Sequence, residues 1–354
     1  MPIHADLNLM SVDTVIVLVN FLGADLVNAR AVEALASGHR VVVADNSGEY
    51  TGAGEVVRPD VNLGFGAGCN LAVASATGET NEIPTANGSG AEWICLANPD
   101  TRIEPGLVTS LVEYAQSQDL DIVAPTLMTC AGKIERGYRQ PNLPRELALT
   151  ALALLRQRRS QQRGPVPTQS VAVSHSRAAK PPLLERLSRR GTGGPRFGSG
   201  AFLVIRRSAW RTVGGFDERF VLYGEDLDLW YRMERSGLSC GFADHIVVEH
   251  AQGKGSPTPR IDRDVLRWAG IELFEQLHHG AIWRRYRWLH ERALQLSFGT
   301  DSDRPDSGVM KLIVGAWNSG NDAIETGQIL RTAFDNDLMR PTSASEETVE
   351  ATHA

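Results

Sequence analysis

Short runs of β-branched and other apolar residues alternate with amphipathic stretches along the first third of the chain. The runs have few polar positions inside them, which is typical of strands buried on both faces of a parallel sheet. The stretches between them carry apolar residues at helical spacing and are bounded by glycine or proline. The predicted strands are 14–19, 40–44, 55–58, 93–97 and 121–125, and the predicted helices are 24–36, 71–76 and 106–116.

This order of strand, helix and strand predicts a Rossmann-like α/β domain. Right-handed crossovers would give a mostly parallel central sheet with helices on both faces. Ligands in such sheets bind outside the carboxyl ends of the strands. Asp45 follows the second strand, and Asn98-Pro99-Asp100 follows strand 93–97. We therefore expect both to lie at the ligand-binding edge.

The apolar pattern resumes in the second half of the chain. Residues 197–205 predict a glycine-spaced strand, and residues 240–243 and 246–249 predict two more, the last of which brings His250 to an exit loop. Residues 263–296 have a helical pattern with interleaved Trp, Tyr and Arg, which suits either a bilayer interface or ordinary packing. From residue 300 the chain is polar and we expect it to be partly disordered.

Residues 214–232 mix acidic side chains with large apolar ones. Glu225, Asp226 and Asp228 would share one turn at a helix start, on the floor of a pocket. A carboxylate there can act as a general base or hold a cation. The alternative is an acidic first turn that complements the helix dipole.

Composition is that of a globular protein. The chain has 354 residues, of which 42% are hydrophobic and 22% charged, so disorder of the whole chain is excluded. Its four cysteines are far apart in sequence and predict reduced, buried thiols rather than disulfides or structural zinc. The sequence has no basic leader followed by an apolar run and no long apolar segment, so we expect a cytoplasmic protein without a membrane span.

The net charge of −6 hides a basic segment. Residues 136–196 contain twelve arginines and one lysine against two glutamates. Such a segment suits anionic partners, namely lipid head groups, phosphorylated acceptors or nucleic acid. A basic loop without a dedicated ligand is the alternative.

Several motifs, taken in order, resemble those of family 2 glycosyltransferases of the GT-A fold, in the bacterial rhamnosyltransferase-like branch. The resemblance covers about residues 14–256 except the basic segment. The motifs are Val19-Asn20-Phe21, Asp45-Asn46-Ser47, Asn62-Leu63-Gly64-Phe65-Gly66 with Asn70, Asn98-Pro99-Asp100, Gly214-Gly215-Phe216-Asp217-Glu218, Glu225-Asp226 and residues 250–256.

The resemblance implies a role for each motif. Asp226 would be the catalytic base with Glu225 as its support, and Asp100 and His250 would bind a divalent cation, Mg²⁺ or Mn²⁺. The implied donor nucleotide-binding residues are Asn20, Asp45, Asn46, Asn62, Gly64, Gly66, Asn70 and Asn98. The implied acceptor-side residues are Gly215, Phe216, Asp217 and Trp230.

The implied reaction is an inverting, metal-dependent glycosyl transfer in cell-wall or polysaccharide biosynthesis. The departing nucleoside diphosphate carries negative charge that a cation neutralises. The expected donor is a nucleotide sugar, with dTDP-rhamnose preferred, and the expected acceptor is a lipid-linked (polyprenyl diphosphate) or cell-wall glycan. We expect no nucleic-acid partner. An anionic membrane surface is the partner expected for the basic segment, with peripheral attachment to the inner face of the cell membrane.

Three other functions remain open. They are transfer of a sugar to a small natural product, a sugar nucleotidyltransferase, and a non-catalytic nucleotide-sugar-binding protein. The nucleotidyltransferase would need a Gly-rich, basic signature near the first strand, and residues 20–28 have none. Leu22 also departs from the family pattern, because a polar residue usually follows the aromatic there.

The expected organisation has five parts. Residues 1–135 form the nucleotide-sugar-binding half and residues 197–260 the acceptor-binding and catalytic half. Between them, residues 136–196 are a basic, partly disordered insertion that contacts membrane or acceptor. Residues 261–298 form amphipathic C-terminal helices, and residues 299–354 form a polar tail.

Overall fold

The computed structural model describes residues 13–78, 91–139, 195–251, 266–267, 269–280, 328 and 332. Most of the basic insertion, most of the motif at residues 250–256 and most of the C-terminal tail lie outside these residues. Within the described residues, no helix is both long and apolar enough to cross a bilayer.

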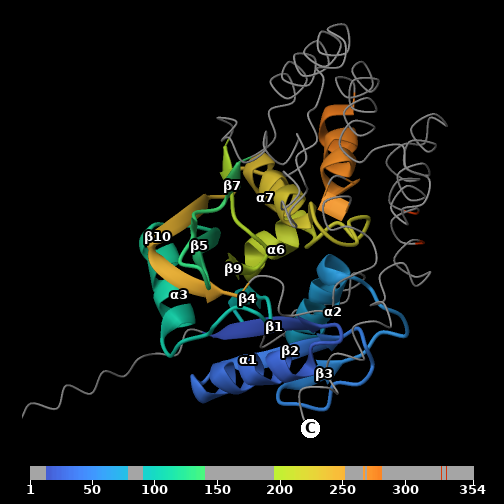
Figure 1. Ribbon diagram of the computed structural model, residues 1–354. Coiled ribbons are helices and arrows are strands. Elements are labelled where there is room, and N and C mark those ends of the chain that lie inside the picture. The colour runs from blue at the N-terminus through green and yellow to red at the C-terminus, as the bar shows by residue number, and fades with distance from the viewer. Residues whose placement is uncertain are drawn as a thin grey trace, which may run out of the picture.

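A mixed eight-stranded sheet forms the centre of the molecule (Figure 1). Its strands are β1 Thr14–Asn20, β2 Arg40–Asp45, β3 Glu55–Val57, β4 Trp93–Ala97, β5 Ile122–Thr129, β6 Ile134–Glu135, β9 Phe202–Arg206 and β10 Cys240–His250. The order is β10-β5-β9-β4-β1-β2-β3, with β6 paired to β5. Strands β7 Tyr138–Arg139 and β8 Arg196–Phe197 form a separate pair.

Apolar side chains alternate between the two faces of the sheet. In β1, Val15 and Val17 belong to one buried cluster and Ile16 and Leu18 to the other, as the two-residue period of a strand requires. Helices α1 Ala24–Ala36 and α3 Leu107–Ser117 cover one face, and α2 Phe65–Thr77, α6 Arg207–Val213 and α7 Glu225–Arg235 cover the other. The α/β fold with helices on both faces is confirmed.

Strand direction determines where the site lies. Strands β1, β2 and β3 are parallel to β4, and β5 is parallel to β10. Strand β9 is antiparallel to both β4 and β5, so those two share one direction. The carboxyl ends of β4 and β10 therefore meet at one edge of the sheet, where β9 begins.

Three element boundaries differ from the predictions. Helix α2 begins at Phe65 rather than at residue 71, so Gly66 and Gly68 lie in its first turn. The predicted strand 197–205 is divided into β8 and β9, because Gly198 to Ala201 turn between them. The two strands predicted at 240–249 form the single strand β10, with a register shift between Ala243 and Val247.

The predicted helix 263–296 is described only in part. Residues 266, 267 and 269–280 are helical, and we refer to 266–280 as the C-terminal helix. Leu273 and Phe274 are fully buried and join the same core cluster as α7.

Candidate active site

The first part of the site is the turn that follows β4. Asp100 comes from this turn and His250 from the end of β10, and Asp100 Oδ1 lies 3.3 Å from His250 Nε2. The backbone amide of Ala251 donates to the Asp100 carbonyl at 2.7 Å, which ties the two strand ends together. The structure thus brings the two predicted metal ligands together.

This pair fits a divalent cation in part. Mg²⁺ and Mn²⁺ commonly take one or two protein ligands together with phosphate oxygens and water. Asp100 and His250 are 9% and 11% exposed, and the described part of the chain holds no cluster of three or more metal-binding side chains. His250 Nδ1 is buried without a hydrogen-bond partner among the described residues. The Asp100 and His250 side chains therefore suit a divalent cation that is held in part by a diphosphate.

A short turn joins the metal pair to Asp226. The Asn98 amide donates to the Ala201 carbonyl at 2.8 Å, and the Gly200 amide donates to Asp226 Oδ2 at 3.1 Å. A Cβ on Gly200 would lie only 3.4 Å from Asp226 Cβ and 3.3 Å from the Phe65 ring. Gly200 therefore permits the close approach of α7 to the edge of the sheet.

Asp226 lies in the first turn of α7 and is partly exposed. Its Oδ1 accepts a hydrogen bond from the Leu227 amide at 2.8 Å. Burial raises the pKa of Asp226, although the amides of Gly200 and Leu227 oppose that rise. A carboxylate of raised pKa at the open edge of a sheet is suited to accept a proton.

Glu225 is placed differently from its neighbour. It is 6% exposed, and its Oε2 is buried without a hydrogen-bond partner among the described residues. Burial, and then the negative charges of Asp226 and Asp228, raise the pKa of Glu225 to about 8. Glu225 therefore packs toward α2 beside Asp226, and its predicted role as the support of Asp226 stays a prediction.

Replacing Glu225 with glutamine is expected to change how stability depends on pH. The pKa of Glu225 is about 8 in the folded protein against an ordinary value of 4.5, so the parent loses stability as pH rises between these values. Glutamine cannot ionise and removes that loss. The melting temperature of E225Q relative to the parent should therefore rise by about 2–5 °C between pH 5 and pH 8, measured by calorimetry. A constant difference across this range would contradict the protonated assignment.

Two predicted nucleotide-binding residues, Asn20 and Asp45, have no exposed surface. Asn20 Nδ2 donates to Asp45 Oδ1 at 2.8 Å, and the Tyr50 amide donates to Asp45 Oδ2 at 2.9 Å. Ser47 Oγ adds a further hydrogen bond to Asp45 Oδ1. Asn20 and Asp45 therefore shape the turn after β2, and their predicted nucleotide contact stays a prediction.

The next predicted loop packs against that turn. Asn46 Nδ2 donates to the Gly64 carbonyl at 2.9 Å, and Asn62 Oδ1 accepts from the Gly64 amide at 3.0 Å. Gly64 has a φ of 82°, and a Cβ there would lie 2.3 Å from the Val221 carbonyl oxygen. Asn46, Asn62 and Asn98 are partly exposed and stay candidates for donor contact.

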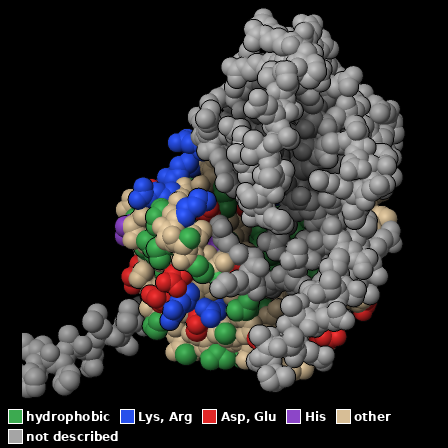
Figure 2. Space-filling model, in the orientation of Figure 1, with side chains coloured by type: hydrophobic (Ala, Val, Ile, Leu, Met, Phe, Trp, Pro, Cys, Tyr) green, Lys and Arg blue, Asp and Glu red, His purple; other side chains and the backbone are tan. Residues whose placement is uncertain are grey.

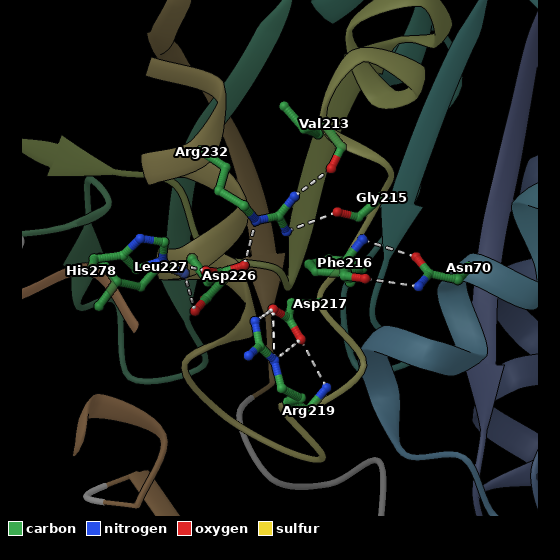
Figure 3. Close-up of polar contacts among 11 residues, drawn as sticks. Asn70, Val213, Gly215, Phe216, Asp217, Arg219, Asp226, Leu227, Arg232 and His278 are labelled. Carbon is green, nitrogen blue, oxygen red and sulfur yellow. Dashed lines mark hydrogen bonds and ion pairs between the residues drawn. The ribbon is translucent and has the colours of Figure 1, made fainter. Parts of the chain in front are cut away.

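Gly66 and Asn70 connect the two halves of the site. A Cβ on Gly66 would lie 3.1 Å from Phe216 Cβ, so this glycine allows close packing. The Asn70 side chain receives a hydrogen bond from the Phe216 amide and donates to the Phe216 carbonyl, each at 2.9 Å (Figure 3). Both residues contact the segment 215–218, and their predicted nucleotide contact stays a prediction.

The four predicted acceptor-side residues are not alike. Phe216 and Trp230 are 2% and 1% exposed and belong to the core, and their predicted acceptor contact stays a prediction. Gly215 is also buried, with Asn70 Oδ1 2.6 Å from where a Cβ would stand. Asp217 is partly exposed and pairs with Arg219 through two carboxylate oxygens, which leaves it a candidate.

The sequence analysis did not identify Gly200 or Arg232. Arg232 Nε donates to Asp228 Oδ2 at 2.7 Å, while its two terminal nitrogens donate to the carbonyls of Val213 and Gly215 at 2.7 and 2.8 Å (Figure 3). The Gly-Ser-Gly spacing before β9 was a usable signal for Gly200.

Comparison with known proteins defines the class. Residues 41–212 match the family described as Glycosyl transferase family 2, and residues 183–301 match Glycosyl transferase family group 2. These matches, together with the α/β sheet, make the protein a glycosyltransferase of family 2 with the GT-A type of α/β fold.

Its branch follows from a more specific likeness. The chain is 27% identical over 242 residues to the N-acetylglucosaminyl-diphospho-decaprenol L-rhamnosyltransferase of Mycobacterium tuberculosis, which covers 66% of this chain and 71% of that protein. The same figures hold for two strains, CDC 1551 and H37Rv. The protein belongs to the rhamnosyltransferase-like branch of the family.

Solved structures with a similar shape are more distant. Residues 1–349 of Staphylococcus aureus TarS match with a TM-score of 0.42 at 11% identity, covering 91% of this chain and 92% of that one. The GalNAc-T7 structure with UDP, GalNAc and Mn²⁺ matches with a TM-score of 0.46 at 12% identity, covering 84% and 53%. At these scores the likeness implies nothing about activity.

Proposed function

We propose that this glycosyltransferase transfers L-rhamnose from dTDP-rhamnose, with inversion, to a hydroxyl of a lipid-linked glycan acceptor in cell-wall or polysaccharide synthesis. The observation that carries the proposed chemistry is the turn Ser199-Gly200-Ala201, which binds Asp226 on one side and the Asn98-Pro99-Asp100 turn on the other. The choice of sugar and acceptor is supported by the Mycobacterium tuberculosis relative, whose name specifies an N-acetylglucosaminyl-diphospho-decaprenol acceptor.

Asp226 would take the proton of the acceptor hydroxyl. The acceptor oxygen forms a bond to the anomeric carbon of the sugar as the bond between that carbon and the diphosphate oxygen breaks, and the nucleoside diphosphate leaves. The Gly200 and Leu227 amides hold the two Asp226 oxygens in place and orient the base. Asn46, Asn62 and Asn98, which are partly exposed, would contact the donor.

Asp100 and His250 would hold the divalent cation. When bound, this ion neutralises charge on the departing diphosphate. The 3.3 Å separation of Asp100 Oδ1 and His250 Nε2 supports a shared ligand role for these two side chains.

The described residues at the two ends of the basic insertion carry part of its charge. Arg136, Arg139 and Arg196 lie at these ends and Lys133 precedes the first, and Figure 2 shows Lys and Arg side chains gathered in the part of the view where β7 lies in Figure 1. Contact of the insertion with an anionic membrane or with the acceptor diphosphate remains a proposal for residues outside those described.

A panel of donors tests the proposal. The purified full chain is incubated with a synthetic N-acetylglucosaminyl diphospho-polyprenol and dTDP-rhamnose, UDP-glucose, UDP-galactose or UDP-N-acetylglucosamine, with Mg²⁺, Mn²⁺ or EDTA. We expect transfer from dTDP-rhamnose that EDTA abolishes, with an inverted anomeric configuration by NMR. Preference for a UDP-hexose would refute the rhamnose assignment. Transfer to small aglycones instead of the lipid would refute the acceptor assignment.

A further inference from the structure

The C-terminal helix packs along α7, the helix that carries Asp226. Tyr231 of α7 lies with its ring 5.2 Å from that of Phe274 and 4.5 Å from that of His278. Leu273 and Phe274 are 0% and 1% exposed and share a core cluster with Leu227. The two helices therefore form one packed unit rather than two neighbouring surfaces.

A buried polar contact fixes one end of this unit. Asp228 has no exposed surface, and His278 Nε2 lies 2.7 Å from its Oδ1 while Arg232 occupies its Oδ2 (Figure 3). Asp228 follows Asp226 by two residues in the same helical turn. His278, fifty positions away in sequence, therefore contacts the first turn of α7.

A close backbone contact fixes the other end. Tyr223 and Gly224 have φ values of 68° and 91°, so two left-handed residues in succession precede Glu225. A Cβ on Gly270 would lie 2.1 Å from the Tyr223 carbonyl oxygen, and the Arg267 guanidinium lies 5.1 Å from the centre of the Tyr223 ring. A left-handed non-glycine residue persists where its surroundings hold it, and here the C-terminal helix supplies those surroundings.

We infer that the C-terminal helix sets the position of Asp226, and that His278 is a positioning residue for the glycosyl transfer. The inference rests on the proposed role of Asp226 as base. Two contacts hold the turn that Asp226 occupies: Gly270 supports the backbone before it and His278 holds the carboxylate after it. Loss of the second would allow the turn to rotate and would displace Asp226 from the acceptor hydroxyl.

His279 provides a matched control on the same helix. Its Nδ1 lies 2.8 Å from Glu275 of its own helix, and its ring contacts Tyr231 and Phe274 as that of His278 does. The polar partner of His279 is thus Glu275, whereas that of His278 is Asp228. Replacement of either histidine removes similar packing against Tyr231 and Phe274, but only His278→Ala removes the contact with Asp228.

The kinetic test compares three variants of the full chain. We expect His278→Ala to lower kcat about 10- to 100-fold with little change in either KM, because a small displacement of a reacting group has this effect. His279→Ala should keep kcat close to that of the parent. His278→Gln, whose amide nitrogen can reach Asp228 Oδ1, should restore most of the lost rate. Equal kcat for His278→Ala and His279→Ala at matched folded fraction would overturn the inference.

Hydrogen exchange gives a readout that does not need activity. In His278→Ala, the backbone amides of residues 223–228 should exchange faster than in His279→Ala and in the parent. Unchanged exchange of these amides would overturn the inference. If His278→Ala shows the faster exchange but the parent transfers no sugar from any donor, the proposed function fails and the structural role of His278 stands.

Discussion

Asp226→Asn is expected to lower kcat for glycosyl transfer by about 10²- to 10⁴-fold, the range found when a general base is removed. Asparagine has nearly the same shape as aspartate. Its side chain has a single oxygen, so it keeps only part of the hydrogen bonding from the Gly200 and Leu227 amides. It cannot accept the proton of the acceptor hydroxyl. The donor should still bind, because the proposed donor contacts are Asn46, Asn62 and Asn98 and do not include Asp226.

Glu225→Gln is the matched control for this change. The two acids are adjacent and both substitutions replace a carboxyl group with an amide, but Glu225 is buried and protonated near neutral pH. We expect E225Q to retain a far larger share of the parent rate than D226N. The measurements are kcat under saturating substrates and donor affinity by calorimetry. Turnover of D226N at the parent rate would remove Asp226 from the mechanism.

Arg232→Ala is expected to be the most destabilising single change in the described region. The substitution removes three hydrogen bonds at once. Among the described side chains, His278 then remains as the hydrogen-bond partner of the fully buried Asp228 carboxylate. Breaking a buried pair by removing one partner costs about 3–5 kcal/mol. For a chain of this size we expect the melting temperature to fall by about 10 °C.

Arg219→Ala provides the comparison for Arg232→Ala. Arg219 pairs with Asp217 in the same segment, but its side chain is 44% exposed, and solvent weakens such pairs to about 0–1 kcal/mol. Scanning calorimetry of both variants should therefore separate them clearly. Similar melting temperatures for the two variants would mean that the Asp228 cluster contributes no more than a surface ion pair.

The strands could be predicted from sequence because each is a short apolar run. Asp100 and His250 could be predicted as neighbours because both follow strands that end at the same edge, which topology alone requires. Asp226 was identified through a family resemblance together with its acidic surroundings. These features are local in sequence or follow from sheet direction.

Other features of the site could not be predicted, because they depend on tertiary packing that leaves little signal in the local sequence. Gly66 and Gly68 weaken a helix by propensity, yet α2 includes them because Phe216 and Val19 pack where a side chain would stand. Trp230 was expected on the acceptor side, and its side chain packs in the core beside Phe242. The contact between His278 and Asp228 has no periodicity that would reveal it from sequence.

The main chain of Gly200 and Ala201 has a consequence for how the enzyme can diversify. The Gly200 amide donates to Asp226, the proposed base, and the Ala201 carbonyl accepts from the turn that carries Asp100. Backbone atoms therefore fix the spacing between Asp226 and that turn, across which the proposed transfer takes place. Side-chain changes in the surrounding loops can alter which sugar or acceptor is chosen without changing that spacing. The reaction geometry and the substrate preference of this chain can therefore vary independently, with Gly200 as the position where a substitution would affect both.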